Sequence, residues 1–258
     1  MQSIISPFNR KAIKESFGRA ASAYDAEAHL QRWVRGRCIA LAKQCWPKDA
    51  HILDAGSGTG VLAQEADWRI AGLDISFGMC EFARGKHDRV VNADAAAMPF
   101  ADGAFDGVFS SLMLQWAGDP AAVWREMARV LKAQGRVVLS TLAAGTLHEL
   151  RQAFSILDAA PHVSHFLEAH EVLEGAATAG FSMVAAEQAR VVEYYPDAVA
   201  LMRALQSIGA SHKQAGRRKG LMTLRQLASV ERAYAKQFGN AQGLPATWQV
   251  LYLVVQKK

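Results

Sequence analysis

A segment that runs from an apolar stretch into a glycine-rich turn constrains the fold of this chain most. Residues His51–Gly60 read HILDAGSGTG, so a predicted strand ends in an acid and is followed by three glycines. Glycine lets a backbone pass close to a ligand and adopt dihedral angles closed to other residues. Nicotinamide and flavin enzymes carry GxGxxG at such a turn, whereas this chain has GxGxG, with Val61 at the position of the third glycine. The spacing favours a cofactor without a pyrophosphate.

Two further acids close the next two predicted strands. Asp74 ends Ile70–Asp74, where a carboxylate can accept both hydroxyls of a ribose. Asp94 ends Val90–Asp94, where a carboxylate can accept the exocyclic amine of an adenine. Each acid taken alone is equally typical of a helix N-cap or a turn. Acids at the ends of three successive strands together favour a ligand with a cationic amino-acid end, a ribose and an adenine.

Short apolar runs alternate with helical ones through the middle of the chain, which predicts βαβ units and a parallel sheet. The clearest helix begins at Asp119-Pro120, an N-cap followed by proline, and continues to Gly135. Further helices are expected over residues 147–158, 168–179, 196–208 and 224–238. The expected strands are residues 51–55, 69–73, 89–92, 105–110, 136–141, 181–192 and 250–255.

The length of 258 residues allows one generous core with appendages. Two Ala-rich helical segments, 8–24 and 25–45, precede a break at Pro47-Lys48-Asp49. We therefore expect an N-terminal helical cap over residues 1–47 and a catalytic domain over 48–258. Insertions that form a lid or a substrate site are expected at about 145–180 and 196–240, and the segment 213–220 is expected to be a mobile loop.

Hydropathy, cysteine content and net charge limit the kinds of protein that this chain can be. No apolar run approaches the roughly 18 residues that span a bilayer, so we expect a cytoplasmic protein without a membrane partner. Cys38, Cys45 and Cys80 form no CxxC pair and no zinc-ligand spacing, so neither a disulfide nor a metal is predicted. The formal charge of +5 favours an acidic partner, and charge alone does not choose among nucleic acid, a membrane surface and an acidic carrier protein.

Over residues 49–141 the chain resembles the class I S-adenosylmethionine-dependent methyltransferases, including at Met98-Pro99-Phe100 and Phe105-Asp106. The resemblance implies an α/β, Rossmann-like fold with a seven-stranded, mostly parallel sheet whose last strand is antiparallel, an N-terminal helical cap and a C-terminal helical lid insert. It implies S-adenosylmethionine, with Asp54 and the glycines at the methionine part, Asp74 at the ribose and Asp94 at the adenine, flanked by Ile75 and Met98. The implied cofactor-binding residues are Asp54, Gly56, Gly58, Gly60, Asp74, Ile75, Asp94, Ala95 and Ser111.

Other motifs, spread over nearly the whole chain, resemble the malonyl-acyl-carrier-protein O-methyltransferases of biotin synthesis. They are residues 17–25, 114–116, 145–150, 158–166 and 202–210. The resemblance implies methylation of the free carboxylate of a malonyl thioester on acyl carrier protein or coenzyme A. Leu114-Gln115-Trp116 also resembles trans-aconitate methyltransferases, so another small acid or a quinone precursor stays open as acceptor. A non-catalytic binding protein stays open too, as does a nucleic-acid methyltransferase, although the chain carries no recognised RNA-binding motif.

A carboxylate acceptor is already ionised at neutral pH, so no general base is needed and no catalytic His or Cys is expected. Aromatic cover would exclude water, and Tyr24, Trp33 and Trp116 are candidates, with core packing the alternative. Arg203 is our candidate for orienting the malonyl carboxylate, with a solvated helix face the alternative, and Gln206 stands where relatives often carry a lysine. The expected catalytic residues are thus Tyr24, Trp116 and Arg203. We expect a monomer or weak oligomer that binds no nucleic acid. A basic cluster near residues 10–19 or 213–219 could dock the carrier protein, with ordinary solvated surface the alternative for each.

Overall fold

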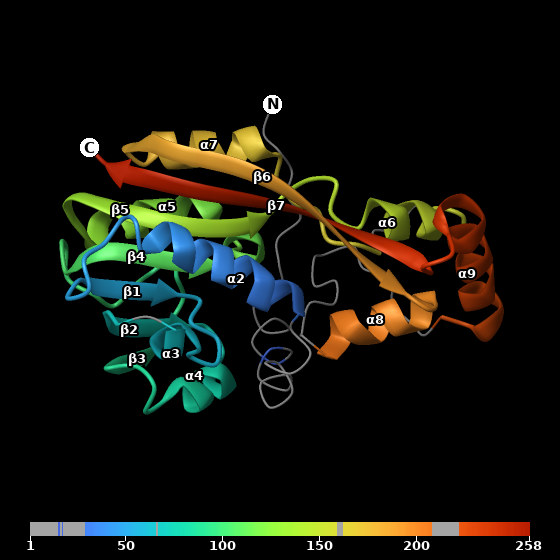
Figure 1. Ribbon diagram of the computed structural model, residues 1–258, viewed down its shortest axis with the longest axis horizontal. Coiled ribbons are helices and arrows are strands. Elements are labelled where there is room, and N and C mark those ends of the chain that lie inside the picture. Colours follow the sequence, from blue (N-terminus) through green and yellow to red (C-terminus); the bar gives the residue numbers. More distant parts are fainter. Residues whose placement is uncertain (1–14, 16, 18–28, 66, 159–161, 208–221) are drawn as a thin grey trace.

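A seven-stranded sheet forms the centre of the molecule in the computed structural model (Figure 1), which describes residues 15, 17, 29–65, 67–158, 162–207 and 222–258. The strand order is β3-β2-β1-β4-β5-β7-β6. The strands are β1 His51–Ala55, β2 Arg69–Asp74, β3 Arg89–Asn92, β4 Phe105–Ser111, β5 Leu131–Leu142, β6 Phe181–Tyr195 and β7 Leu244–Lys257.

The strand directions confirm the expected topology. Strands β1 to β5 pair in parallel, whereas β7 runs antiparallel to both of its neighbours, β5 and β6. The strand order reverses beside β1, because β2 lies on one side of it and β4 on the other. In open α/β sheets, ligands bind at the carboxyl ends of the strands beside such a reversal. The glycine turn that follows β1 therefore lies where this topology favours a ligand.

Helices cover both faces of the sheet. On one face, Leu30, Val34 and Cys38 of α2 pack with β-strand residues that include Phe109 and Tyr252. On the other face, α5 and α7 bury side chains against the same strands, and Trp124 of α5 is almost fully buried. Each buried side chain of this size contributes about 1.5–3 kcal/mol. The helices are α2 His29–Ala42, α3 Leu62–Glu65, α4 Phe77–Ala83, η1 Leu114–Trp116, α5 Pro120–Val130, α6 His148–Phe154, α7 Ala169–Thr178, α8 Ala198–Ser207 and α9 Leu224–Phe238.

Helix α5 begins as predicted and ends earlier than predicted. Asp119 is its N-cap and accepts a hydrogen bond from the Ala122 N–H, and Pro120 is the first helical residue. The prediction that the helix continues to Gly135 is wrong, since β5 begins at Leu131. Leu131 pairs with Phe105 and Arg136 with Gly107, so the residues between them form a bulge in which Gln134 has a φ of 62°. Helical periodicity does not distinguish this bulged strand from another turn of helix.

The predicted division into a cap, a catalytic domain and insertions stays a prediction. Of the predicted N-terminal cap, α2 lies within the described residues and packs directly on the sheet. Helices α6, α8 and α9 lie together at the end of the molecule toward which β1, β4 and β5 point (Figure 1). The predicted loop 213–220 lies outside the described residues.

The described part of the chain contains no helix long and apolar enough to cross a membrane. It also contains no cluster of three or more His, Cys, Asp or Glu side chains arranged to hold a metal. Cys38, Cys45 and Cys80 are free thiols.

Candidate functional site

The glycine turn after β1 adopts a backbone conformation that few other residues tolerate. Gly56, Gly58 and Gly60 have φ values of 81°, 52° and 80°. A Cβ atom on Gly56 would lie 2.5 Å from the Cβ of Met113, and one on Gly60 would lie 2.9 Å from the His87 ring. The N–H groups of Gly56 and Ser57 donate to the Leu73 carbonyl at 2.8 and 3.0 Å, which ties the turn to β2. The turn is thus held close to the carboxyl ends of both strands.

Asp74, at the end of β2, holds the same turn through its side chain. One carboxylate oxygen accepts the N–H of Gly58 at 3.0 Å and the other accepts the N–H of Ser76 at 2.8 Å. Burial raises the pKa of Asp74 to about 6, against the opposing effect of these two hydrogen bonds. A carboxylate desolvated to this degree gains from additional hydrogen-bond donors, such as a pair of ribose hydroxyls.

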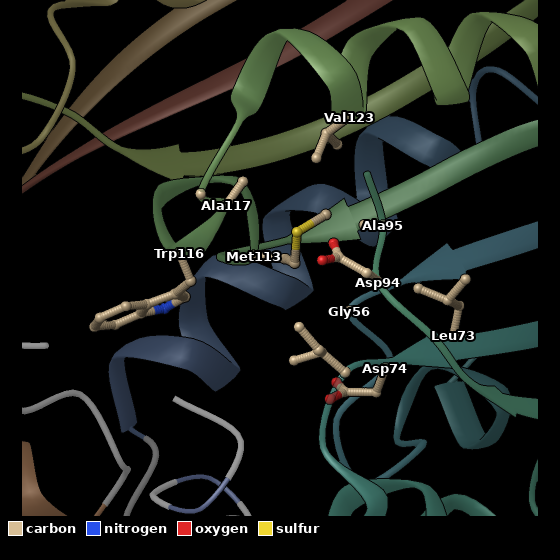
Figure 2. Close-up of a pocket in the computed structure, with 11 residues that line it drawn as sticks. Gly56, Leu73, Asp74, Asp94, Ala95, Met113, Trp116, Ala117 and Val123 are labelled. Atoms are coloured by element: carbon tan, nitrogen blue, oxygen red, sulfur yellow. The ribbon is translucent and has the colours of Figure 1, made fainter. Parts of the chain in front are cut away.

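A cavity of about 490 Å³ opens beside this carboxylate (Figure 2). Asp74 at the end of β2 and Asp94 in the loop after β3 line it, as Figure 2 shows. Ile75 and Ala95 line it as well. One oxygen of Asp94 accepts the Ala96 N–H at 2.9 Å, so this acid also supports the turn that follows β3. The predicted ribose and adenine residues are thus brought together around one space. Met98 does not line it; this residue is buried in the core and its N–H donates to Glu126.

A second cavity, of about 460 Å³, lies next to the first and shares Gly56 with it. Asp54, Gly58 and Ser111 line it, and their role at the amino-acid end of the cofactor stays a prediction. Gly60 lines neither cavity and packs against His87 instead. The two cavities form an elongated cleft with its middle at the glycine turn.

Two residues around this cleft were missed by the sequence analysis. Arg35 of α2 lines the second cavity, and its guanidinium donates two hydrogen bonds to Glu65 of α3, at 3.1 and 3.2 Å. It is the one cationic side chain among the described residues that line this cavity, which makes it a candidate to hold a carboxylate. No signal in the sequence separates Arg35 from Arg32 or Arg37 on the same helix.

The other missed residue is His87, whose ring is fully buried beneath the turn. Its Nε2 lies 3.4 Å from Oδ2 of Asp54, and its ring occupies the space beside Gly60 and Gly72. Contact with two glycines and the motif acid indicates that His87 fixes the position of Asp54 at the second cavity. His87 precedes β3 without any motif, so only the fold reveals this role.

The residues expected to contact the methyl acceptor do not lie together within the described structure. Trp116 lines the first cavity, and its ring packs edge-on against Phe17 at 5.6 Å between centroids. Arg203 and Gln206 are exposed on α8, and Arg203 lines neither cavity. Trp33 is 49% exposed and contacts the Tyr252 ring, so it lies neither in the core nor in the cleft. Tyr24 lies outside the described residues. The catalytic roles of Tyr24, Trp116 and Arg203 stay predictions.

Comparison with known proteins agrees with this geometry. Residues 53–139, which contain the glycine turn and all three strand-end acids, match a family model described as a methyltransferase domain. A malonyl-acyl-carrier-protein O-methyltransferase of Laribacter hongkongensis is 36% identical over 95% of this chain and 88% of its own length. The biotin biosynthesis bifunctional protein BioHC of Cellvibrio japonicus is 33% identical, and the alignment covers 99% of this chain and 52% of that protein.

Solved structures share the fold at low sequence identity. A SAM-dependent methyltransferase of Thermotoga maritima superposes with a TM-score of 0.58 at 17% identity, over 95% of this chain and 99% of that chain. The geranyl diphosphate C-methyltransferase of Streptomyces coelicolor, solved with S-adenosylhomocysteine, gives 0.54 at 15% identity, over 90% and 82% of the two chains. The fold, the glycine turn and the 36% identity over nearly the whole chain lead to one assignment. This chain belongs to the malonyl-acyl-carrier-protein O-methyltransferase family, within the class I S-adenosylmethionine-dependent methyltransferases.

Proposed function

We propose that this protein transfers the methyl group of S-adenosylmethionine to the free carboxylate of a malonyl thioester, carried on acyl carrier protein. One structural observation supports the proposal most strongly. Two cavities meet at Gly56, one with the carboxylates of Asp74 and Asp94 and the other with Asp54 and Arg35. The identity of the acceptor rests on the names of relatives that match this chain over nearly its whole length.

The residues in the cleft fit S-adenosylmethionine, a molecule that supplies a methyl carbon activated by a sulfonium. Asp74 has two carboxylate oxygens at the cavity to accept ribose hydroxyls, and the carboxylate of Asp94 lines the same cavity, where it would accept the adenine amine. Across Gly56, Asp54 is placed to accept an ammonium group and Arg35 to donate to a carboxylate. These opposite charges match the two ends of an amino acid. The absence of a Cβ at Gly56 leaves the middle of the cleft open.

The chain's own contribution to the reaction is orientation and exclusion of water. A malonate carboxylate is ionised at neutral pH, so its oxygen needs no base before it attacks the methyl carbon. The described residues that line the two cavities include no His or Cys. Trp116, at the edge of the first cavity, would cover the reacting atoms together with Phe17. Alignment of reactants recovers roughly 7–11 kcal/mol of a barrier, which makes positioning the main source of rate.

The proposed pathway is biotin synthesis, since the Cellvibrio japonicus relative is named a biotin biosynthesis protein. This chain spans about half the length of that bifunctional protein, so it would correspond to one of two activities. The methyl ester hides the charge of the malonyl group, which lets chain-elongating enzymes treat the product as an apolar primer. A cytoplasmic location and a monomeric or weakly oligomeric state remain predictions from the sequence.

A methyl-transfer assay tests the proposal. The protein is incubated with methyl-labelled S-adenosylmethionine and, in separate reactions, malonyl-acyl carrier protein, malonyl-coenzyme A or trans-aconitate. We expect label on the malonyl thioesters and its release as methanol on mild base treatment, as an ester requires. Transfer to trans-aconitate alone would contradict the proposed acceptor, and failure to bind the cofactor by calorimetry would favour a non-catalytic protein.

A further inference from the structure

One face of helix α9 packs against the rest of the protein, so the opposite face points toward solvent. Val230 and Tyr234 are fully buried, and the Tyr234 hydroxyl donates to the Pro245 carbonyl at 2.7 Å. Glu231 turns toward α8 and accepts the N–H of Ala198 at 2.7 Å. A capping box between Thr223 and Gln226 starts the helix. The outward side chains therefore project from a rigid support.

The outward face of α9 is basic. Arg225, Arg232 and Lys236 follow one another at intervals of seven and four residues, which places them along a single face of the helix. All three are exposed, and small residues, Ala228, Ser229 and Ala235, lie between them. Leu224 at the start of the helix is 86% exposed. We call Leu224, Arg225, Arg232 and Lys236 the α9 face.

No acid of the described structure neutralises these three cations. The ion pairs among described residues involve other arginines and lysines, and the Arg232 guanidinium donates only to the Ser229 hydroxyl, at 3.2 Å. The acid of the helix itself, Glu231, is turned inward. An uncompensated row of cations attracts an acidic partner over a distance comparable to the Debye length, about 8–10 Å at moderate salt.

The α9 face also lies at the end of the molecule at which the cofactor cleft is found. Figure 1 shows α6, α8 and α9 beyond the end of the sheet toward which β1, β4 and β5 point, and the cofactor cleft opens at the carboxyl ends of these strands. The side chain of Gln237 donates to Gln152 at 3.0 Å, which ties α9 to α6. A partner docked here would lie at the end of the molecule at which the cleft is found.

We infer that the α9 face docks the acyl carrier protein, through acidic side chains of that protein. The inference rests on the proposed function, because in that proposal the carrier protein carries the malonyl group that is methylated. Small residues between the cations let the surface of the partner approach closely, while the cations meet its carboxylates and Leu224 supplies an apolar contact. The clusters at 10–19 and 213–219, predicted from the sequence as docking sites, lie mostly outside the described residues and stay predictions.

A charge-reversal experiment tests this docking surface. The variant R225E/R232E/K236E is compared with K48E/R69E/R89E, whose three exposed cations lie at the amino ends of β1, β2 and β3, at the opposite edge of the sheet. Initial rates are measured with malonyl-acyl carrier protein and with malonyl-pantetheine, which has the same thioester and no protein. Binding of fluorescently labelled carrier protein without a malonyl group is measured by anisotropy. The cofactor dissociation constant checks that each variant is folded.

We expect R225E/R232E/K236E to lower kcat/KM for malonyl-acyl carrier protein at least about tenfold, mainly through KM, and to weaken carrier binding by a similar factor. Rates with malonyl-pantetheine and all values for the control variant should stay within about twofold of the unmodified protein. The neutral variant R225Q/R232Q/K236Q should fall between them.

Equal carrier binding by the two charge-reversed variants, or an equal loss with malonyl-pantetheine, would overturn the α9 face as a docking site. If the unmodified protein methylates neither malonyl substrate, the proposed function fails. In that case the anisotropy measurement still decides whether α9 binds the carrier protein.

Discussion

The N–H of Gly58 donates to the carboxylate of Asp74 at 3.0 Å, so the acid at the end of β2 holds the glycine turn that follows β1. This one hydrogen bond connects the two cavities of the cleft, because Asp74 lines the first and Gly58 the second. The predicted ribose acceptor therefore also sets the shape of the turn. A ligand that binds Asp74 in the first cavity therefore contacts the residue that also holds Gly58, which lines the second cavity.

Cofactor affinity should fall as the pH drops below about 6. Burial raises the pKa of Asp74 from 3.8 to about 6 in the free protein, and only the ionised form accepts both ribose hydroxyls. Ligand binding to the ionised form releases a proton below this pKa, so the dissociation constant should rise about tenfold per pH unit below 6 and level off above 7. Calorimetry from pH 5 to 8 measures this. D74N should bind weakly with no such dependence, and an unchanged slope in D74N would assign the titration to another group.

Replacing Asp74 by Ala should affect the cofactor far more than the acceptor. Loss of a bidentate, charge-assisted pair costs on the order of 2–3 kcal/mol, which is roughly a 30- to 150-fold rise in the cofactor dissociation constant. The Michaelis constant for the malonyl substrate, measured at saturating cofactor, should change little. Equal increases in both constants would contradict the role assigned to Asp74.

Arg35 should recognise the carboxylate at the amino-acid end of the cofactor. R35A should raise the dissociation constant of S-adenosylhomocysteine about 10- to 150-fold, since a hydrogen bond to a charged group contributes about 1.5–3 kcal/mol. Adenosine lacks that carboxylate, so its weaker binding should be unchanged. R32A, an exposed arginine on the same helix, is the matched control. If R35A weakens both ligands equally, the residue supports the fold and not the amino-acid end.

The two glycines of the turn should differ in their tolerance of alanine. Gly56 and Gly58 both have positive φ, which costs an alanine about 1–2 kcal/mol. A Cβ on Gly58 meets no atom within 4 Å, whereas one on Gly56 lies 2.5 Å from Met113. Overpacking should add about 1–3 kcal/mol to the cost of G56A. Urea unfolding without cofactor measures both, and equal destabilisation would show that the Met113 contact relaxes freely.

Local patterns in the sequence were sufficient to predict the sheet and the adenosine side of the cleft. The first and third strands have the predicted bounds, His51–Ala55 and Arg89–Asn92, because each is a short apolar run set between turn residues. Acids at strand ends are visible in the sequence, and parallel strands bring their carboxyl ends to one edge. Asp74 and Asp94 therefore met at one cavity as expected.

The remaining parts of the site depend on contacts between distant segments. Arg35 reaches the cleft only because α2 packs across the sheet, and His87 reaches Asp54 from a loop 33 residues away. Neither residue belongs to a pattern that differs from an ordinary helix or loop. The last strand was predicted as residues 250–255 but spans Leu244–Lys257, because its pairing with the long β6 extends both ends. Pairing partners of this kind are not encoded in a strand's own residues.

A crystal structure with S-adenosylhomocysteine in excess would show how the cofactor lies in the cleft. We expect adenine beside Asp94, both ribose hydroxyls on Asp74, and the amino-acid end across Gly56 between Asp54 and Arg35. A ligand bound in the reverse orientation, or a glycine turn that stays empty at saturating ligand, would contradict this arrangement.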